Sequence, residues 1–150
     1  GVRGQHIMRP RKNGFTLVEL IVVIMILGIL ATIAVPRFLE TSGRALDNAT
    51  RSSLAVVRNA IELYTADHNG ALPGQSNDLP GDLANYLRGD FPASAAKSND
   101  RGISYYSDDA AALSADETTN GWVYSTVTGE FIVNSGAALS SDSSVTYDQL

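Results

Sequence analysis

The apolar residues of this chain are concentrated in one continuous run near its start. Residues 15–35 contain a single charged side chain, Glu19, and are otherwise almost entirely apolar. At 1.5 Å per residue, a helix of this length spans about 31 Å, which matches the hydrocarbon core of a bilayer. The pattern therefore predicts a membrane-spanning helix, and a carboxylate inside it is expensive enough to indicate a function.

The helical spacing of apolar residues continues beyond Pro36. It is carried by Leu39, Leu46, Leu54, Val57, Ile61 and Tyr64. Pro36 lacks an N–H and is expected to kink the helix or to leave a carbonyl one turn earlier unpaired. Asn69–Gly70 predicts the end of the helix, because glycine readily adopts the left-handed conformation that terminates helices. We therefore expect one helix from Phe15 to about His68.

The remainder of the chain has the composition of loops and short strands. Strands are predicted at residues 103–106, 121–127 and 130–134, the last two joined by Thr128–Gly129, and a further strand is possible at residues 144–147. A short helix is expected at residues 82–87.

About eighty residues are too few to build a large core alone. The sheet is therefore expected to bury its apolar face against the long helix. The predicted fold class is α+β: a long N-terminal helix, transmembrane in its first half, with a small antiparallel β-sheet packed on its C-terminal half, like a lollipop.

The residues before the apolar run are basic and end in glycine. Arg9, Arg11 and Lys12 are expected to stay cytoplasmic under the positive-inside rule. A secretory signal is cleaved after its apolar region, whereas here the small residue at a boundary is Gly14, before it. Cleavage between Gly14 and Phe15 would retain the helix and create an α-amine four residues from Glu19. Met8 offers an alternative start, which would shorten the leader to residues 8–14.

The segment Gly14-Phe15-Thr16-Leu17-Val18-Glu19, with its basic leader and apolar run, resembles the prepilin family of type IV pilins and type II secretion pseudopilins. The resemblance implies cleavage after Gly14 by a prepilin peptidase, which also N-methylates Phe15. It implies assembly with other copies or homologous pilins into a filament, with Glu19 facing the Phe15 amine of a neighbour and an inner-membrane assembly platform as a partner. Gly28 and Pro36 lie where filament-forming relatives loosen this helix.

The resemblance also implies where the chain resides and how it divides. The expected location is the bacterial inner membrane, crossed once with the N-terminus in the cytoplasm and the head in the periplasm, followed by a periplasmic or extracellular filament. Lipid would surround the helix before assembly. The expected parts are a leader over residues 1–14, an assembly helix over 15–36, its continuation over 37–69 and a small head over 70–150.

Three alternatives remain open at this point. The apolar run could be a signal anchor that merely tethers a domain, although this leaves Glu19 unpaired. Glu19 could be neutralised by the α-amine of its own chain, one helical turn away. The chain could also be a minor or tip pilin whose head binds a secreted substrate, a surface or DNA.

Charge and cysteine content narrow the classes of function. The chain carries 11 basic and 16 acidic side chains, a net charge of −5, and no cysteine. Loss of the leader would make it more acidic, so no general affinity for nucleic acid is expected. The absence of cysteine departs from the many pilins that close a C-terminal loop with a disulfide, and it leaves disulfide-free pilins and pseudopilins open.

Two further patterns in the sequence are candidate binding sites, one for a neighbouring subunit and one for a metal ion. Four arginines recur every seven residues and form one stripe on the helix: Arg37, Arg44, Arg51 and Arg58. Nearby acids suggest either weak surface pairs or a seam between subunits. Asp108, Asp109 and Asp116 are weak candidates for Ca²⁺ ligands, and a solvated acidic loop is the simpler interpretation because no EF-hand spacing occurs. No catalytic constellation or cofactor motif is evident, so an enzyme is not expected.

Overall fold

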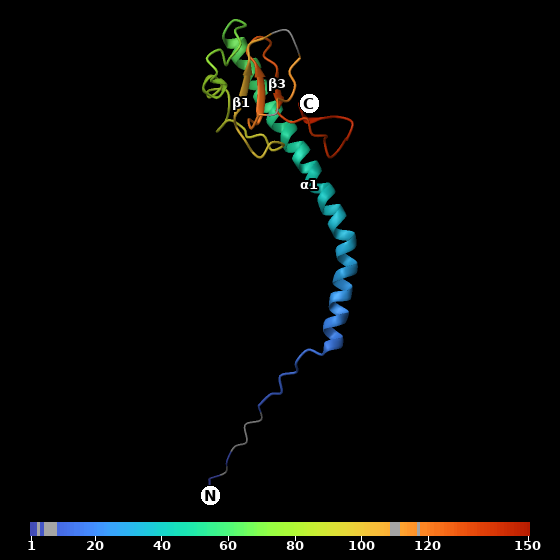
Figure 1. The fold of residues 1–150 in the computed structure, drawn as a ribbon. Helices are drawn as coiled ribbons and strands as arrows, with labels where there is room; N and C mark the ends of the chain where they lie inside the picture. The colour runs from blue at the N-terminus through green and yellow to red at the C-terminus, as the bar shows by residue number, and fades with distance from the viewer. Residues whose placement is uncertain (3, 5–8, 109–111, 117) are drawn as a thin grey trace. The chain divides into compact units, whose positions relative to one another are not determined.

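The computed structural model describes residues 1–150 except 3, 5–8, 109–111 and 117. The chain divides into two compact units, residues 1–38 and residues 39–150, and helix α1 (Leu17–Asp67) contributes to both. After α1 come a short helix α2 (Leu79–Asp82), three strands and a final 3-10 turn η1 (Tyr147–Gln149) (Figure 1).

Helix α1 confirms the prediction of one long N-terminal helix. It starts two residues later than expected, at Leu17, and it continues through Pro36. At its C-terminal end, Asn69 and Gly70 both have positive φ angles, 53° and 89°, and the Gly70 N–H donates to the Thr65 carbonyl at 2.8 Å. This left-handed pair ends the helix as predicted.

The sheet contains the three strands β1 (Ile103–Tyr106), β2 (Trp122–Ser125) and β3 (Phe131–Val133), in the order β1-β2-β3. β2 and β3 form the predicted antiparallel hairpin, with Trp122 opposite Val133. β1 pairs with β2 in parallel, so the expectation of a purely antiparallel sheet is wrong. A parallel pair needs a connection of a dozen or more residues between its strands, and the chain between Tyr106 and Trp122 is long enough to provide it.

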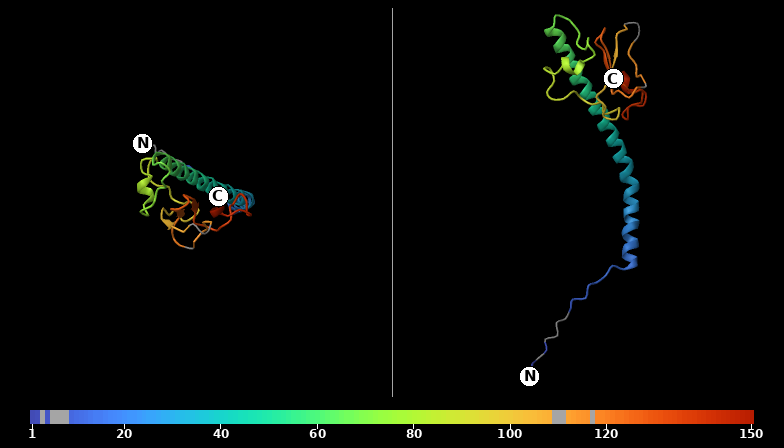
Figure 2. Two further views of the ribbon diagram at one scale, coloured as in Figure 1. Left: turned by 90° about the horizontal axis from the view of Figure 1, so that it is seen from above. Right: turned by 60° about the vertical axis from the view of Figure 1, so that its left-hand side comes forward.

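The core of the second unit lies between the sheet and the C-terminal part of α1, which lie side by side in both views (Figures 1 and 2). Leu54, Val57 and Ile61 of α1 are buried against the sheet, as predicted, with the aromatic side chains of Trp122 and Phe131. The Trp122 and Phe131 rings are 4.9 Å apart between centroids. The α+β architecture, with a small sheet packed on the C-terminal part of a long helix, is therefore confirmed.

The irregular segments differ from the predictions in detail. The short helix occupies residues 79–82 rather than 82–87, because Asp78 caps it by accepting from the Gly81 N–H. The proposed strand at residues 144–147 is wrong: the structure has one isolated bridge between Ala138 and Thr146, followed by the 3-10 turn η1. Asp148 and Ser135 hold this terminal segment through a backbone hydrogen bond of 3.0 Å.

Candidate functional site

The first turn of α1 is fixed by two reciprocal hydrogen bonds between Thr16 and Glu19. The Thr16 N–H donates to Glu19 Oε2 at 3.0 Å, and the Glu19 N–H donates to Thr16 Oγ1 at 3.2 Å. This is a capping box, in which each side chain satisfies a backbone donor that the helix start leaves unpaired. Its usual sequence signal, Thr followed by Glu three residues later, is present here, and it moves the helix start from the expected Phe15 to Leu17.

The predicted cleavage position, Gly14–Phe15, lies just before this capping box and outside the helix. Phe15 is 89% exposed, and Gly14 is exposed as well. A Cβ added at Gly14 would meet no atom within 4 Å, and Gly14 does not have a positive φ angle. Neither backbone conformation nor packing in the described part of the chain therefore requires glycine at this position.

The apolar run is entirely exposed to the surroundings. Every side chain from residue 14 to residue 40 is exposed, including fifteen large apolar side chains between Phe15 and Val35. Burying one such side chain is worth about 1.5–3 kcal/mol, so leaving the run in water would forfeit roughly 20 kcal/mol or more. Within the described residues, α1 is also the one helix that is long and apolar enough to cross a membrane. The run requires lipid or other chains around it.

Gly28 and Pro36 both lie at exposed positions inside this helix. A Cβ at Gly28 would meet nothing within 4 Å, although glycine destabilises a helix interior by about 0.5–1 kcal/mol relative to alanine. Pro36 lacks the N–H that would bond the Thr32 carbonyl. The Thr32 hydroxyl donates to the Ile29 carbonyl at 2.7 Å. Both residues weaken the helix, as the predicted assembly role would require.

The four arginines of the stripe have different surroundings. Arg37 belongs to the first unit, and the other three belong to the second. Arg44 pairs with Glu40 at 2.6 Å on the exposed surface. The Arg58 Nε and Nη2 atoms both donate to the Phe131 carbonyl, at 3.1 and 2.8 Å. Burial lowers the pKa of Arg58, and the nearby Glu130 carboxylate opposes this effect.

The Arg58 guanidinium is therefore already hydrogen-bonded within its own chain, to the Phe131 carbonyl of β3. Arg51 is exposed and lines the same groove of about 420 Å³ as Arg58, Glu62 and Leu150. An intersubunit seam made by the whole stripe stays a prediction, and Arg58 is its least available member.

Asp47, one of the acidic residues close to the arginine stripe in the sequence, is buried. It is 1% exposed and accepts from the Tyr147 hydroxyl at 2.5 Å and from the Ser141 N–H at 2.7 Å. It thereby ties the C-terminal loop to α1. Burial raises the pKa of Asp47, but these hydrogen bonds outweigh it and leave the pKa below the ordinary value of 3.8.

The position of Asp47 had a signal in the sequence. Asp47, Thr50, Leu54, Val57 and Ile61 are spaced by three and four residues and are all buried. Leu39 and Leu46, which carry the same helical spacing in the sequence, are 66% and 37% exposed. Gly43 lets the C-terminal loop approach α1 closely, because a Cβ there would lie 2.5 Å from Ser140 Oγ of that loop.

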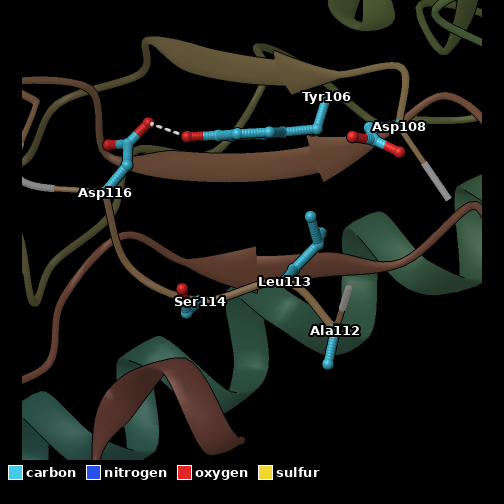
Figure 3. A pocket seen from close by; sticks show the side chains of 6 residues that line it. All are labelled: Tyr106, Asp108, Ala112, Leu113, Ser114 and Asp116. Carbon is cyan, nitrogen blue, oxygen red and sulfur yellow. Dashed lines mark hydrogen bonds between the residues drawn. The ribbon is translucent and has the colours of Figure 1, made fainter. Parts of the chain in front are cut away.

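Asp108 and Asp116, two of the calcium candidates, line a cavity of about 270 Å³ with Tyr106, Leu113 and Ser114. In Figure 3 the Tyr106 side chain separates them: Asp116 lies at its hydroxyl end and Asp108 at the opposite end. The third candidate, Asp109, lies outside the described residues. Among the residues that the structure describes, no three His, Cys, Asp or Glu side chains gather at one point.

The Asp116 carboxylate is the centre of a hydrogen-bond network instead. It accepts from the Tyr106 hydroxyl at 2.9 Å, from the Thr118 N–H at 3.1 Å and from Asn134 Nδ2 at 2.5 Å. Burial raises the pKa of Asp116, but the hydrogen bonds from Thr118, Ser104, Asn134 and Tyr106 lower it far below its usual range. The carboxylate thus orders the loop before β2.

Comparison with known proteins places these features in a family. The family model described as the prokaryotic N-terminal methylation motif matches residues 9–35. This range contains the basic leader, the capping box and the apolar run. No solved structure matches the chain.

Curated relatives match part of the chain. Type II secretion system core protein G of Aeromonas hydrophila is 39% identical over 61 residues, which are 41% of this chain and 43% of the relative. The type IV narrow pilus major component PilA5 of Thermus thermophilus is 43% identical over 60 residues, 40% of this chain and 52% of the relative. The type IV major pilin protein PilA of Myxococcus xanthus is 42% identical over 58 residues, 39% of this chain and 26% of the relative.

The matched region spans about half the length of these relatives or less. The chain is therefore similar, over part of its length, to type IV pilins and type II secretion pseudopilins, and residues 9–35 match the prokaryotic N-terminal methylation motif.

Proposed function

We propose that this chain is a structural subunit of a type IV pilus or of a type II secretion pseudopilus. In this proposal a prepilin peptidase cleaves after Gly14 and methylates the new Phe15 amine, and the mature chain polymerises through residues 15–36. The observation that carries the proposal is the complete exposure of the apolar run, with a single carboxylate, Glu19, near its start. Lipid can cover the apolar side chains, but hydrocarbon offers the carboxylate no partner.

The surroundings of Glu19 support the need for an external cation. Its partner in the capping box is a neutral backbone N–H, and within the described residues no ion pair of Glu19 occurs. A charge held in hydrocarbon costs about 2.5–3.5 kcal/mol on insertion scales. An α-amine generated at Phe15 of a neighbouring subunit would offset this cost, and the offset is available only after cleavage and assembly.

The proposal includes a location and partners. The basic leader would hold the N-terminus in the cytoplasm, with the second unit in the periplasm of a bacterium, before subunits enter a periplasmic or extracellular filament. The partners would be other copies or homologous pilins, the prepilin peptidase, an inner-membrane assembly platform and, before assembly, lipid. The prepilin motif and the names of the relatives support this, and an enzymatic role is not part of the proposal.

Expression of the full chain with a prepilin peptidase tests the proposal. We expect intact-mass analysis to find a chain that begins at Phe15 with one added methyl group, and shearing to release filaments that contain it. Gly14→Val should block cleavage without altering the fold, because a Cβ at this position meets no atom within 4 Å. Gly28→Ala is the matched control, which should be cleaved normally. A wild-type chain that keeps its leader, or that never enters filaments, would refute the proposal.

A further inference from the structure

The position at which α1 begins decides the backbone conformation of the bond that would be cut. Thr16 caps the helix, and its carbonyl accepts the first helical hydrogen bond, from the Leu20 N–H at 3.2 Å. Residues 11–16 have no regular secondary structure, and the Gly14–Phe15 peptide lies just before the cap. A protease can bind such a peptide directly, whereas a peptide in the first turn of a helix has helical dihedral angles and its carbonyl bonded to the N–H four residues later.

The sequence contains a second residue that can cap a helix, three positions before Thr16. Asn13 is among the residues preferred at the N-cap. A helix that began after Asn13 would include Gly14 and Phe15 in its first turn and would enclose the bond between them. In the structure this alternative is not adopted: the helix begins at Leu17, after the capping box of Thr16 and Glu19.

We propose that the Thr16 side chain, with Glu19 as its partner, is a positioning residue for proteolytic processing. The capping box holds the start of α1 beyond Phe15 and so keeps the Gly14–Phe15 peptide in a conformation that a protease can bind. The inference rests on the proposed cleavage after Gly14. In that step water adds to the Gly14 carbonyl carbon, the C–N bond to Phe15 breaks, Gly14 leaves as a carboxylate and the Phe15 nitrogen becomes the new α-amine.

The capping role of Glu19 differs chemically from its proposed role in assembly. Capping requires a side-chain oxygen that accepts a hydrogen bond, and glutamine supplies one equally well. Pairing with an amine in a filament requires the negative charge, which glutamine lacks. Glu19→Gln therefore separates processing from assembly.

The test measures the initial rate of leader removal in the full chain, in membranes that contain a prepilin peptidase. Thr16→Val has nearly the same shape but no oxygen to accept the Glu19 N–H, and we expect cleavage to slow about fivefold, as for the loss of an N-cap of ordinary strength. Thr16→Ser restores the acceptor and should be cleaved at close to the wild-type rate. Glu19→Gln should also be cleaved at close to that rate.

A second measurement follows the conformation rather than the reaction. In the uncleaved full chain in detergent micelles, the ¹³Cα chemical shift of Phe15 should be that of non-helical backbone in the wild type and in Thr16→Ser. It should move towards the helical value in Thr16→Val.

The outcomes distinguish this inference from the proposed function. Equal cleavage of Thr16→Val and wild type, or an unchanged Phe15 shift in that variant, would overturn the inference and leave the proposed function standing. Slow cleavage of Thr16→Ser would also overturn it, because the peptidase would then recognise threonine itself. A wild-type chain that is never cleaved would refute the proposed function instead.

Discussion

The two units of this chain treat apolar side chains in opposite ways. In residues 1–38 every described side chain is exposed, including the whole apolar run. In residues 39–150 the large aromatic side chains Trp122, Tyr124 and Phe131 are 1% exposed or less. The second unit therefore has a core of its own in water, while the first can be stable only when lipid or other chains surround it. One helix, α1, has its surfaces adapted to two different solvents.

The same contrast holds for the carboxylates of α1. Asp47 is buried, and neutral donors from the C-terminal loop satisfy it within the chain. Glu19 is exposed in an apolar segment, and among the described residues its carboxylate accepts the capping bond from the Thr16 N–H. The carboxylate of Asp47 thus has its donors within its own chain, whereas that of Glu19 would gain a cationic partner only through the proposed assembly.

The largest expected effect is on filament yield when Glu19 loses its charge. Glu19→Gln keeps the capping box but removes the anion that the proposed neighbour's amine would meet. We expect about a tenfold or greater loss of sheared filaments with normal leader removal, because charge-assisted hydrogen bonds are among the strongest. Glu40→Gln is the control, since Glu40 pairs with Arg44 outside the apolar run. A normal filament yield in Glu19→Gln would contradict the pairing.

The second largest effect is expected at Asp47 in a fragment of residues 39–150. We expect this fragment to fold, and Asp47→Ala to lower its free energy of unfolding by roughly 2–4 kcal/mol, because the buried Tyr147 hydroxyl and the N–H groups of Ser140 and Ser141 lose a charged acceptor. Urea denaturation measures this change. Asp142→Ala in the same loop is the control: Asp142 is exposed, and its carboxylate accepts from Ser144 two residues away, so a much smaller change is expected. Equal losses in both variants would contradict the role of Asp47.

The pH dependence of unfolding should follow the carboxylates of the second unit. The folded-state pKa values of Asp47 and Asp116 are lower than the unfolded value of 3.8. The unfolded chain therefore binds more protons in acid, and the stability that these groups contribute is present above pH 3.8 and is lost as the pH falls through their folded pKa values.

Urea midpoints of the fragment should accordingly fall from pH about 4 downward. The fall should be shallower in Asp47→Asn, which has no proton to bind at this position. At the alkaline end, burial and the nearby Asp47 raise the pKa of Tyr147 from 10.0 to about 12. The stability it contributes should be present below pH 10 and lost as the pH rises through 12. A fragment whose stability does not change in acid would contradict this account.

The smallest expected effect compares two arginines of the same stripe. Arg58→Met should destabilise the fragment by about 1–2 kcal/mol, because the Phe131 carbonyl loses both guanidinium donors. Arg51→Met should change stability by no more than about 0.5 kcal/mol, since Arg51 is exposed. If the filament depends on both residues equally while the fragment is unaffected by either change, the stripe acts between subunits instead.

Local rules explain why some features of the fold were predictable. The apolar run, the Asn69–Gly70 terminator and the hairpin with its Thr128–Gly129 turn are each determined by a few neighbouring residues, and the structure contains all three. The pairing of β1 with β2 was not predictable, because alternation of side chains indicates a strand but not the direction of its partner. That direction depends on the course of residues 107–121.

The candidate site shows the same division between local and long-range information. The capping box was available from the sequence as Thr16 followed by Glu19 at the third position, and was missed. The partners of Asp47 are separated from it by about a hundred residues of chain, so no local pattern could identify Ser141 and Tyr147. Only the spacing of Asp47 relative to Leu54 indicated that it faces inward.

The contact between Arg58 and β3 limits how strands of other molecules can pair with the free edge of the sheet. The Glu130 carbonyl accepts from the Ser125 N–H of β2, so the next carbonyl, that of Phe131, points away from β2 towards the free rim of the sheet. A guanidinium already fills that acceptor. The Phe131 carbonyl is therefore not free to accept a hydrogen bond from a strand of another molecule. In the proposed filament, where many copies are close together, the sheet of each subunit would therefore stay separate and not pair edge to edge with the sheet of another subunit.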